Sequence, residues 1–188
     1  FLTPCLLYEG LRLGLLLNDR WAALVILAIG ISMVIVAFAT AQRLHCKELR
    51  FSHPRFTRNI RLVQISDVHI GSRSARFLER VVKAINSKNP DFVLITGDFL
   101  DAKRVGPKDI ASLKTLNAPI YFSIGNHERY AGLEWVIPML EDAGCILLRT
   151  QAVSFEELQL IGIDDAEDRH QVKHELAKID LAREHFKI

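Results

Sequence analysis

Three short apolar runs rich in β-branched residues constrain the fold of this chain more than any other feature, because a polar motif follows each run. The runs cover residues 61–66, 91–96 and 119–124 and have the length and composition of buried parallel strands. Each interval between them has room for a strand–helix–strand unit. The carboxyl ends of parallel strands meet at one edge of an open α/β sheet, where such sheets bind ligands. We therefore predict an α/β fold whose three motifs converge in one crevice.

The three motifs contain the ligand types of a two-metal centre. In chain order they are Asp67-Val68-His69, Gly97-Asp98-Phe99-Leu100-Asp101 and Gly125-Asn126-His127-Glu128. Asp67 and His69 lie on the same side of an extended backbone and can hold one cation. Asp98 has two carboxylate oxygens and can bridge two cations about 3.5–4 Å apart. Asn126 offers a neutral amide oxygen to the second cation, which leaves His127 free for proton transfer.

The combination of motifs is far more specific than its parts. Asp-x-His and Gly-Asp-x-x-Asp are each common in ordinary turns. Gly-Asn-His-Glu fixes four residues, and the three motifs in order at three strand ends are too specific for turn chemistry alone. Gly97 and Gly125 lack a Cβ and let the backbone turn sharply and approach a substrate. The motifs therefore favour a catalytic centre that acts at phosphorus.

These residues resemble the calcineurin-like metallophosphoesterases over roughly residues 61–163. Two further segments are similar to the bacterial membrane-associated phosphodiesterase branch of that family, namely Gly125-Asn-His-Glu-Arg-Tyr-Ala-Gly132 and Gly162-Ile-Asp-Asp165. The resemblance implies a layered sheet with flanking helices and two divalent cations, for which Mn, Fe and Zn are candidates. It implies the following metal ligands: Asp67, His69, the bridging Asp98, and Asn126. It makes His127 a catalytic acid or a substrate clamp, and it makes Asp101 a supporting residue that binds no cation.

The family completes its centre with later histidines, typically one on a following strand and then a Gly-His-x-His pair. This chain reaches Ile188 without that pattern, and four protein ligands are few for two cations. The chain begins at Phe1, and residues 185–188 have the composition of an opening strand. We therefore expect a fragment cut at both ends, with an incomplete sheet and centre, that is inactive by itself.

The remaining polar candidates are less specific. His170 and His174 are four residues apart on a polar stretch, which we interpret as a solvated helix face rather than a metal site. Asp164 and Asp165 follow an apolar run at residues 158–163, and either a turn or a role near the substrate fits them. Between the motifs, helical spacing predicts helices near residues 78–85, 107–116, 133–143 and 168–183.

A second large feature is the stretch of residues 21–41, which contains no Asp, Glu, Lys or Arg. As a helix it would span about 31 Å, close to the thickness of a bilayer. A buried soluble helix seldom lacks a polar face over this length, and a cleaved signal peptide has a shorter apolar core nearer the start of the chain. We predict a membrane anchor. Residues 1–20 then form an interfacial or partial membrane segment, 42–59 a basic linker, and 60–188 the beginning of the metallophosphoesterase domain.

The charges around the anchor predict its orientation. Six basic residues follow it, against Glu48 alone: Arg43, Lys47, Arg50, Arg55, Arg58 and Arg61. The positive-inside rule then puts the catalytic part on the cytoplasmic side of a bacterial inner membrane. The basic stretch fits both a solvated linker and contact with anionic headgroups.

Composition narrows the function further. A net charge of +2 without a basic face gives no reason to expect a nucleic-acid partner, and three separated cysteines form no disulfide or zinc pattern. The predicted function is hydrolysis of a lipid-linked or nucleotide-linked phosphoester at the membrane. A general phosphomonoesterase or nuclease with the same centre, and a membrane scaffold without catalysis, remain as alternatives.

Overall fold

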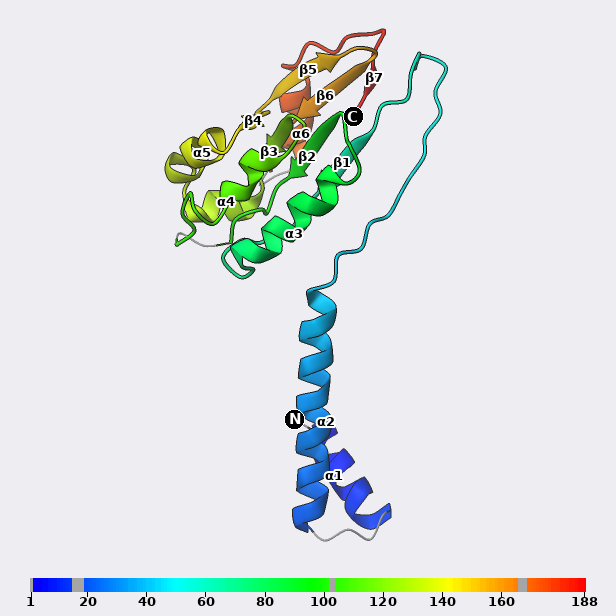
Figure 1. Cartoon of the computed structure of the whole chain (residues 1–188), viewed down its shortest axis with the longest axis vertical. Helices are drawn as coiled ribbons and strands as arrows, with labels where there is room; N and C mark the ends of the chain where they lie inside the picture. The colour runs from blue at the N-terminus through cyan, green and yellow to red at the C-terminus, as the bar shows by residue number, and fades with distance from the viewer. Residues whose placement is uncertain (1, 15–18, 102–103, 166–168) are drawn as a thin grey trace. The chain divides into compact units, whose positions relative to one another are not determined.

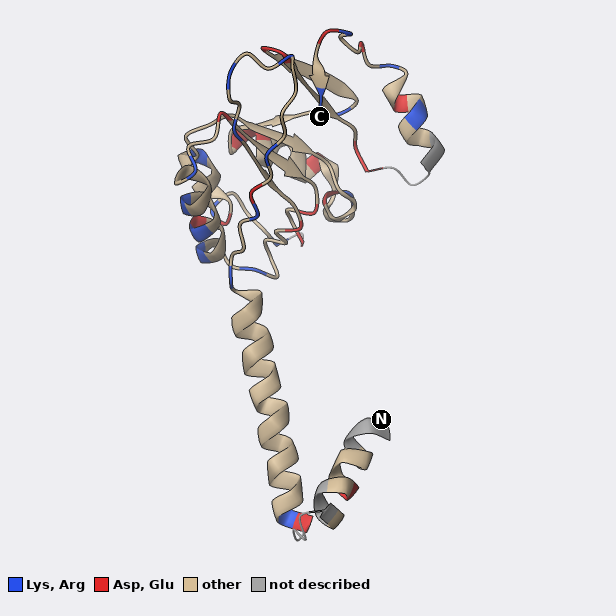
Figure 2. Cartoon of the chain, turned by 90° about the vertical axis from the view of Figure 1, so that its right-hand side faces the viewer, with Lys and Arg blue, Asp and Glu red and all other residues tan. Residues whose placement is uncertain are grey.

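The N-terminal part of the chain forms a unit of its own. The computed structural model describes residues 2–14, 19–101, 104–165 and 169–188, and the chain divides into Phe1–Glu48 and Leu49–Ile188. The first unit contains helices α1 (Leu2–Gly14) and α2 (Asp19–Ala41). After Asp19 and Arg20, no charged residue follows in α2 (Figure 2). With 23 residues and a mean hydropathy of 2.8, α2 is long and apolar enough to cross a membrane.

A four-stranded parallel sheet forms the centre of the second unit (Figure 1). Its order is β1-β2-β3-β4, with β1 (Leu62–Ile65), β2 (Phe92–Thr96), β3 (Ile120–Ser123) and β4 (Cys145–Leu147). Neighbouring strands are all parallel, with Leu62 beside Phe92 and Val93 beside Ile120. The three predicted strands are therefore confirmed, and the α/β fold class with them.

Helices cover one face of this sheet and a second sheet covers the other. Alternate residues of β2 point into two hydrophobic cores, one on each face of the sheet. Val93 and Ile95 pack with α3 (Ala75–Asn86) and α5 (Leu133–Asp142), whereas Phe92 and Leu94 pack on the opposite side. The second sheet contains β5 (Gln151–Phe155), β6 (Leu158–Gly162) and β7 (Phe186–Lys187). β5 and β6 pair antiparallel, and β7 joins β6 in parallel. The predicted layers and the strand at residues 185–188 are confirmed.

The predicted helices agree with the structure in part. Helix α3 begins at the N-cap Ser74 and buries the predicted apolar stripe. Helix α5 continues through Pro138 and is followed by Gly144 at a φ of +90°. Its residues Val136 and Leu140 are buried, whereas Trp135 is 50% exposed and does not belong to the core.

Two predicted helices are wrong in type or extent. Within residues 107–116, the structure has the 3₁₀-helix η1 (Ala111–Thr115). The Asn86 side chain lies at its end, where it donates to the Thr115 carbonyl and accepts from the Asn117 N–H. The helix predicted at 168–183 is shortened to α6 (Arg169–Leu176). The buried side chain of Gln159 holds the chain beyond α6, because it donates to the Asp180 carbonyl and accepts from the Ala182 N–H. Those backbone groups therefore have partners that a helix does not provide.

Candidate metal centre

The loops that follow β1 and β2 run side by side beyond the strands. The Asp67 N–H donates to the Gly97 carbonyl at 3.3 Å, the His69 N–H to the Asp98 carbonyl at 3.1 Å, and the Ile70 N–H to the Phe99 carbonyl at 2.8 Å. These bonds extend the parallel register into the motifs. His69 is thereby fixed beside Asp98 at the carboxyl edge of the sheet.

The backbone of these loops is unusual for residues that carry side chains. Asp67, His69 and Asp98 have φ angles of 55°, 52° and 52°, in the left-handed region that L-residues seldom adopt. Such conformations cost about 1–3 kcal/mol each and cluster at functional sites. Gly97 and Gly125 permit the loops to approach closely, since a Cβ on Gly97 would lie 2.8 Å from the Gly125 Cα. Here glycine is required by space, as the sequence predicts.

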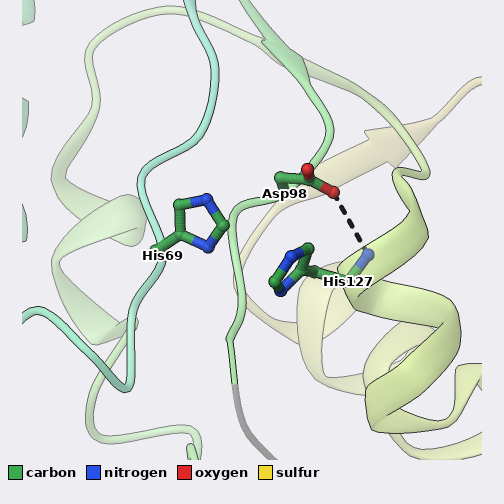
Figure 3. Close-up of side chains that lie close together, drawn as sticks. All are labelled: His69, Asp98 and His127. Atoms are coloured by element: carbon green, nitrogen blue, oxygen red, sulfur yellow. Dashed lines mark hydrogen bonds between the residues drawn. The ribbon is translucent and has the colours of Figure 1, made fainter.

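Three side chains converge at this edge, from the loops after β1 and β2 and from helix α4 (Asn126–Ala131), as Figure 3 shows. Each of His69, Asp98 and His127 offers a ligand atom, and these atoms all lie within 4.8 Å of one another. The imidazole rings meet edge to face with centroids 4.6 Å apart. The His127 backbone N–H donates to Oδ1 of Asp98 at 3.1 Å. The three motifs therefore meet in one place, although a cation was expected to use His69 and Asp98 without His127.

Asp101 lies between the two histidines. Its Oδ1 is 2.8 Å from Nδ1 of His127 and 3.3 Å from Nδ1 of His69. The Ser72 hydroxyl donates to its other oxygen. This hydroxyl, and then the two imidazoles, lower the pKa of Asp101 against the opposing effect of burial. An ionised Asp101 holds Nδ1 of His127 and leaves its Nε2 available to other groups.

Asn126 and Asp67 each lie next to a member of this cluster. The Asn126 amide faces Asp98, and with its nitrogen oriented to donate, that atom lies 2.8 and 3.0 Å from the two carboxylate oxygens. A half-turn of the amide brings its oxygen to the same point, so it could serve a cation there. The Asp67 side chain is 66% exposed, and its Oδ1 is 3.9 Å from Nε2 of His69. Carboxylate, imidazole and amide donors in this arrangement fit first-row divalent cations.

The sequence interpretation missed Glu128. Its side chain is fully buried, and it accepts hydrogen bonds from four backbone N–H groups, those of Asp98, Phe99, Leu100 and Gly125. A usable signal was present, because Glu is the preferred third helical residue after an N-cap, the position that Glu128 has after Gly125. The bonds to residues 98–100 have no signal in the sequence.

The other candidates lie outside the cluster. Asp164 accepts from Nε of Arg149 at 2.8 Å, and the Asp165 N–H donates to the Ile124 carbonyl at 2.8 Å. Asp164 thus has a structural partner beside the end of β3, and its role toward a substrate stays a prediction. The side chain of His174 is 74% exposed, which agrees with a solvated face, whereas that of His170 lies outside the described side chains.

Comparison with known proteins gives the family of this chain. Residues 60–174 match the family model of the calcineurin-like phosphoesterases, and because this match covers more than half of the chain, the chain belongs to that family. An uncharacterised metallophosphoesterase of Campylobacter jejuni is 28% identical over 138 residues, covering 68% of this chain and 36% of that protein. The resemblance inferred from the motifs is therefore confirmed.

Two further relatives carry more descriptive names. A transmembrane protein with metallophosphoesterase domain from Danio rerio is 31% identical over 134 residues, 62% of this chain and 29% of that protein. The UDP-2,3-diacylglucosamine pyrophosphatase LpxG of Chlamydia muridarum is 33% identical over 84 residues, 42% of this chain and 25% of that protein. The chain thus spans 36% or less of the length of these three relatives.

Proposed function

We propose that this protein hydrolyses phosphoesters with two divalent cations, Mn, Fe or Zn, at the carboxyl edge of its parallel sheet. The observation that carries the proposal is the convergence of His69, Asp98 and His127 within 4.8 Å. In this proposal Asp67 and His69 bind one cation, Asp98 bridges the two, and Asn126 binds the second.

The residues divide the chemistry among them. When bound, two cations supply positive charge to the phosphoryl oxygens and lower the pKa of a water molecule. In hydrolysis a water molecule gives up one proton and its oxygen bonds to phosphorus, the bond from phosphorus to the leaving oxygen breaks, and the leaving oxygen takes up a proton. Nε2 of His127 can present that proton while Asp101 holds Nδ1 at 2.8 Å. Asp101 therefore orients the donor without touching the substrate.

Metal binding by the whole protein, purified in detergent, tests this centre. We expect two Mn²⁺ ions per chain by equilibrium titration. The second should be held more weakly, because its proposed ligands among these residues are Asp98 and Asn126 alone, whereas the first has three. Binding of no Mn²⁺, or binding that is unchanged when Asp98 becomes Asn, would contradict the proposal and favour a scaffold without catalysis.

We propose further that the substrate is a lipid-linked or nucleotide-linked phosphoester. The support is the name of one relative, a UDP-2,3-diacylglucosamine pyrophosphatase, together with helix α2, which has no charged residue after Arg20. The whole protein in membranes should hydrolyse a nucleotide-linked glycolipid faster than p-nitrophenyl phosphate or an oligonucleotide. Faster turnover of either of the latter two would identify a general phosphomonoesterase or a nuclease instead.

Helix α2 is proposed to anchor the protein in a bacterial inner membrane, with residues 60–188 on the cytoplasmic side. Burial of about twenty apolar residues does not depend on surface charge, so the protein should remain in the membrane through high-salt and alkaline washes. Cys46, which is exposed after α2, reports the orientation in a Cys5→Ser background. A membrane-impermeant maleimide should label it in broken cells and not in intact spheroplasts, and the reverse result would invert the topology.

Several of the basic residues after the anchor have partners within the second unit. Arg58 pairs with Asp91 and Glu156, Arg55 donates to the Arg183 carbonyl, and Arg61 donates to the Lys88 carbonyl. These contacts give Arg55, Arg58 and Arg61 a role in the folded unit. They favour an ordered linker over headgroup contact for residues 55–61.

A further inference from the structure

Glu128 is a fully buried carboxylate that carries no role in the proposed chemistry. Its Oε2 accepts the N–H groups of Asp98 and Gly125, each at 2.9 Å. Its Oε1 accepts those of Phe99 at 2.8 Å and Leu100 at 2.9 Å. One side chain of α4 thus takes up three consecutive N–H groups of the loop after β2 and one from the loop after β3.

These four N–H groups lie outside the strand ladders, so they need another acceptor. Consecutive N–H groups turn toward one point where a left-handed residue interrupts the chain, and such concave arrangements ordinarily bind an external anion. Here Asp98 has a φ of +52° and Gly97 one of +77°. Glu128 therefore supplies an internal acceptor for these groups and stabilises an otherwise unfavourable loop conformation.

The same contacts fix the side chain of Asp98. Its backbone N–H is held by Glu128, while its Oδ1 accepts the His127 N–H at 3.1 Å. A Cβ on Gly125 would lie 2.4 Å from Oδ1 of Asp98 and 3.0 Å from Oε2 of Glu128, so Gly125 packs against both carboxylates. Asp98 is thereby held at its backbone and at its carboxylate by a single turn of chain.

We infer that Glu128 is a positioning residue for the metal bridge: by binding the N–H groups of residues 98–100 and 125, it aims Asp98 at the point shared by the two cations. The inference rests on the proposed metal centre. Glu128 contacts neither cation nor substrate and acts through Asp98.

Replacement of Glu128 by Gln isolates this role. The side chain keeps its size, but in either orientation its NH₂ group faces two N–H groups that have lost their acceptor. We expect Mn²⁺ affinity about 10- to 100-fold weaker than in the wild type, the usual effect of residues that orient metal ligands. Because the bridge would be misaligned, the electron paramagnetic resonance signal of a coupled Mn²⁺ pair should give way to that of isolated ions.

Asp91→Asn is the matched control. Asp91 also accepts a backbone N–H, that of Arg61 at 2.7 Å, but it precedes β2, whereas Asp98 follows it. A merely structural carboxylate would lower thermal stability and leave Mn²⁺ binding unchanged, and this is the result expected for Asp91→Asn. Glu128→Asp keeps the carboxylate, and its Mn²⁺ affinity should lie between those of the wild type and Glu128→Gln. If the Gln variant does not fold, the Mn²⁺ affinity of Glu128→Asp tests the inference.

The outcomes separate the two proposals. A wild type that binds no Mn²⁺ removes the metal centre, whatever the variants do. A wild type that binds two coupled ions, with Glu128→Gln and Glu128→Asp binding them as tightly and with the same spectrum, overturns the positioning role alone. Loss of Mn²⁺ affinity of similar size in Asp91→Asn would also overturn it, because the effect would then belong to stability in general.

Discussion

Carboxylates lie near both ends of strand β2, but the residues that pair with them differ. At the amino end, Asp91 accepts from Nη1 of Arg58 at 3.0 Å and from the Arg61 N–H at 2.7 Å. Beyond the carboxyl end, Oδ1 of Asp101 lies beside the imidazoles of His69 and His127, and Asp67 of the neighbouring loop lies 3.9 Å from Nε2 of His69. Arginine charges never titrate near neutral pH, whereas imidazoles can be neutral ligands. At the amino end the carboxylate is therefore paired with a fixed positive charge, whereas at the carboxyl end the carboxylates lie beside imidazoles, as the proposed metal centre requires.

The sharpest test of this contrast is the same change at both ends of β2. Asp98→Asn removes one charge from two coordination spheres, and we expect turnover of the whole protein to fall about 10³-fold or more, with loss of bound metal. Asp91→Asn should leave turnover and metal content within about twofold, since it lies outside the centre. Elemental analysis and rate measurement on both variants check this. Equal effects would show that the two ends do not differ in function.

His127→Ala separates proton transfer from metal binding at the carboxyl end. We expect turnover to fall about 10²- to 10⁴-fold while metal content stays largely intact, because a proton donor acts in the transition state. The loss should shrink for substrates whose leaving groups are very acidic. An equal loss for all leaving groups would indicate a clamp, and a loss of metal would make His127 a ligand, as its place beside His69 and Asp98 allows.

Asp101→Asn should have a smaller effect than loss of His127 itself. The amide oxygen can still accept from Nδ1 of His127, but the charge that orients the ring is gone. We expect kcat to fall about 10- to 100-fold with little change in KM. Ser72→Ala, which removes one donor to the same carboxylate, is the milder companion variant.

The smallest expected effect is at the amino end and concerns stability alone. The Arg61 N–H, followed by the Arg58 guanidinium, holds the pKa of Asp91 below its ordinary value. A lowered pKa in the folded state contributes stability above the unfolded pKa of about 3.9, and that stability is lost as the pH falls through the folded pKa. Asp91→Asn should cost about 1 kcal/mol at pH 7, and in chemical denaturation the difference should shrink as the pH falls below about 4 and vanish only below the folded pKa.

Prediction from sequence succeeded where local pattern and function coincide. The runs before Asp67, Asp98 and Gly125 are parallel strands, and the central strand β2 is buried because β-branched apolar residues suit a sheet covered on both faces. The edge strand β1 is only partly buried, so its predicted burial is wrong. Prediction failed where a distant side chain decides the local structure. Gln159 holds residues 180 and 182 out of a helix, and Glu128 holds residues 98–100, and neither contact has a local sequence pattern.

The four hydrogen bonds to Glu128 also predict how slowly these amide hydrogens exchange with solvent. Amide hydrogens of loops ordinarily exchange with solvent quickly, whereas those of core strands exchange only when a larger part of the molecule opens. The amides of Asp98, Phe99, Leu100 and Gly125 share one buried acceptor, and exposing one of them disturbs the partners of the others. They should therefore exchange as slowly as the amides of β2 and as a single cooperative group, so that two loops far apart in the chain open and close together.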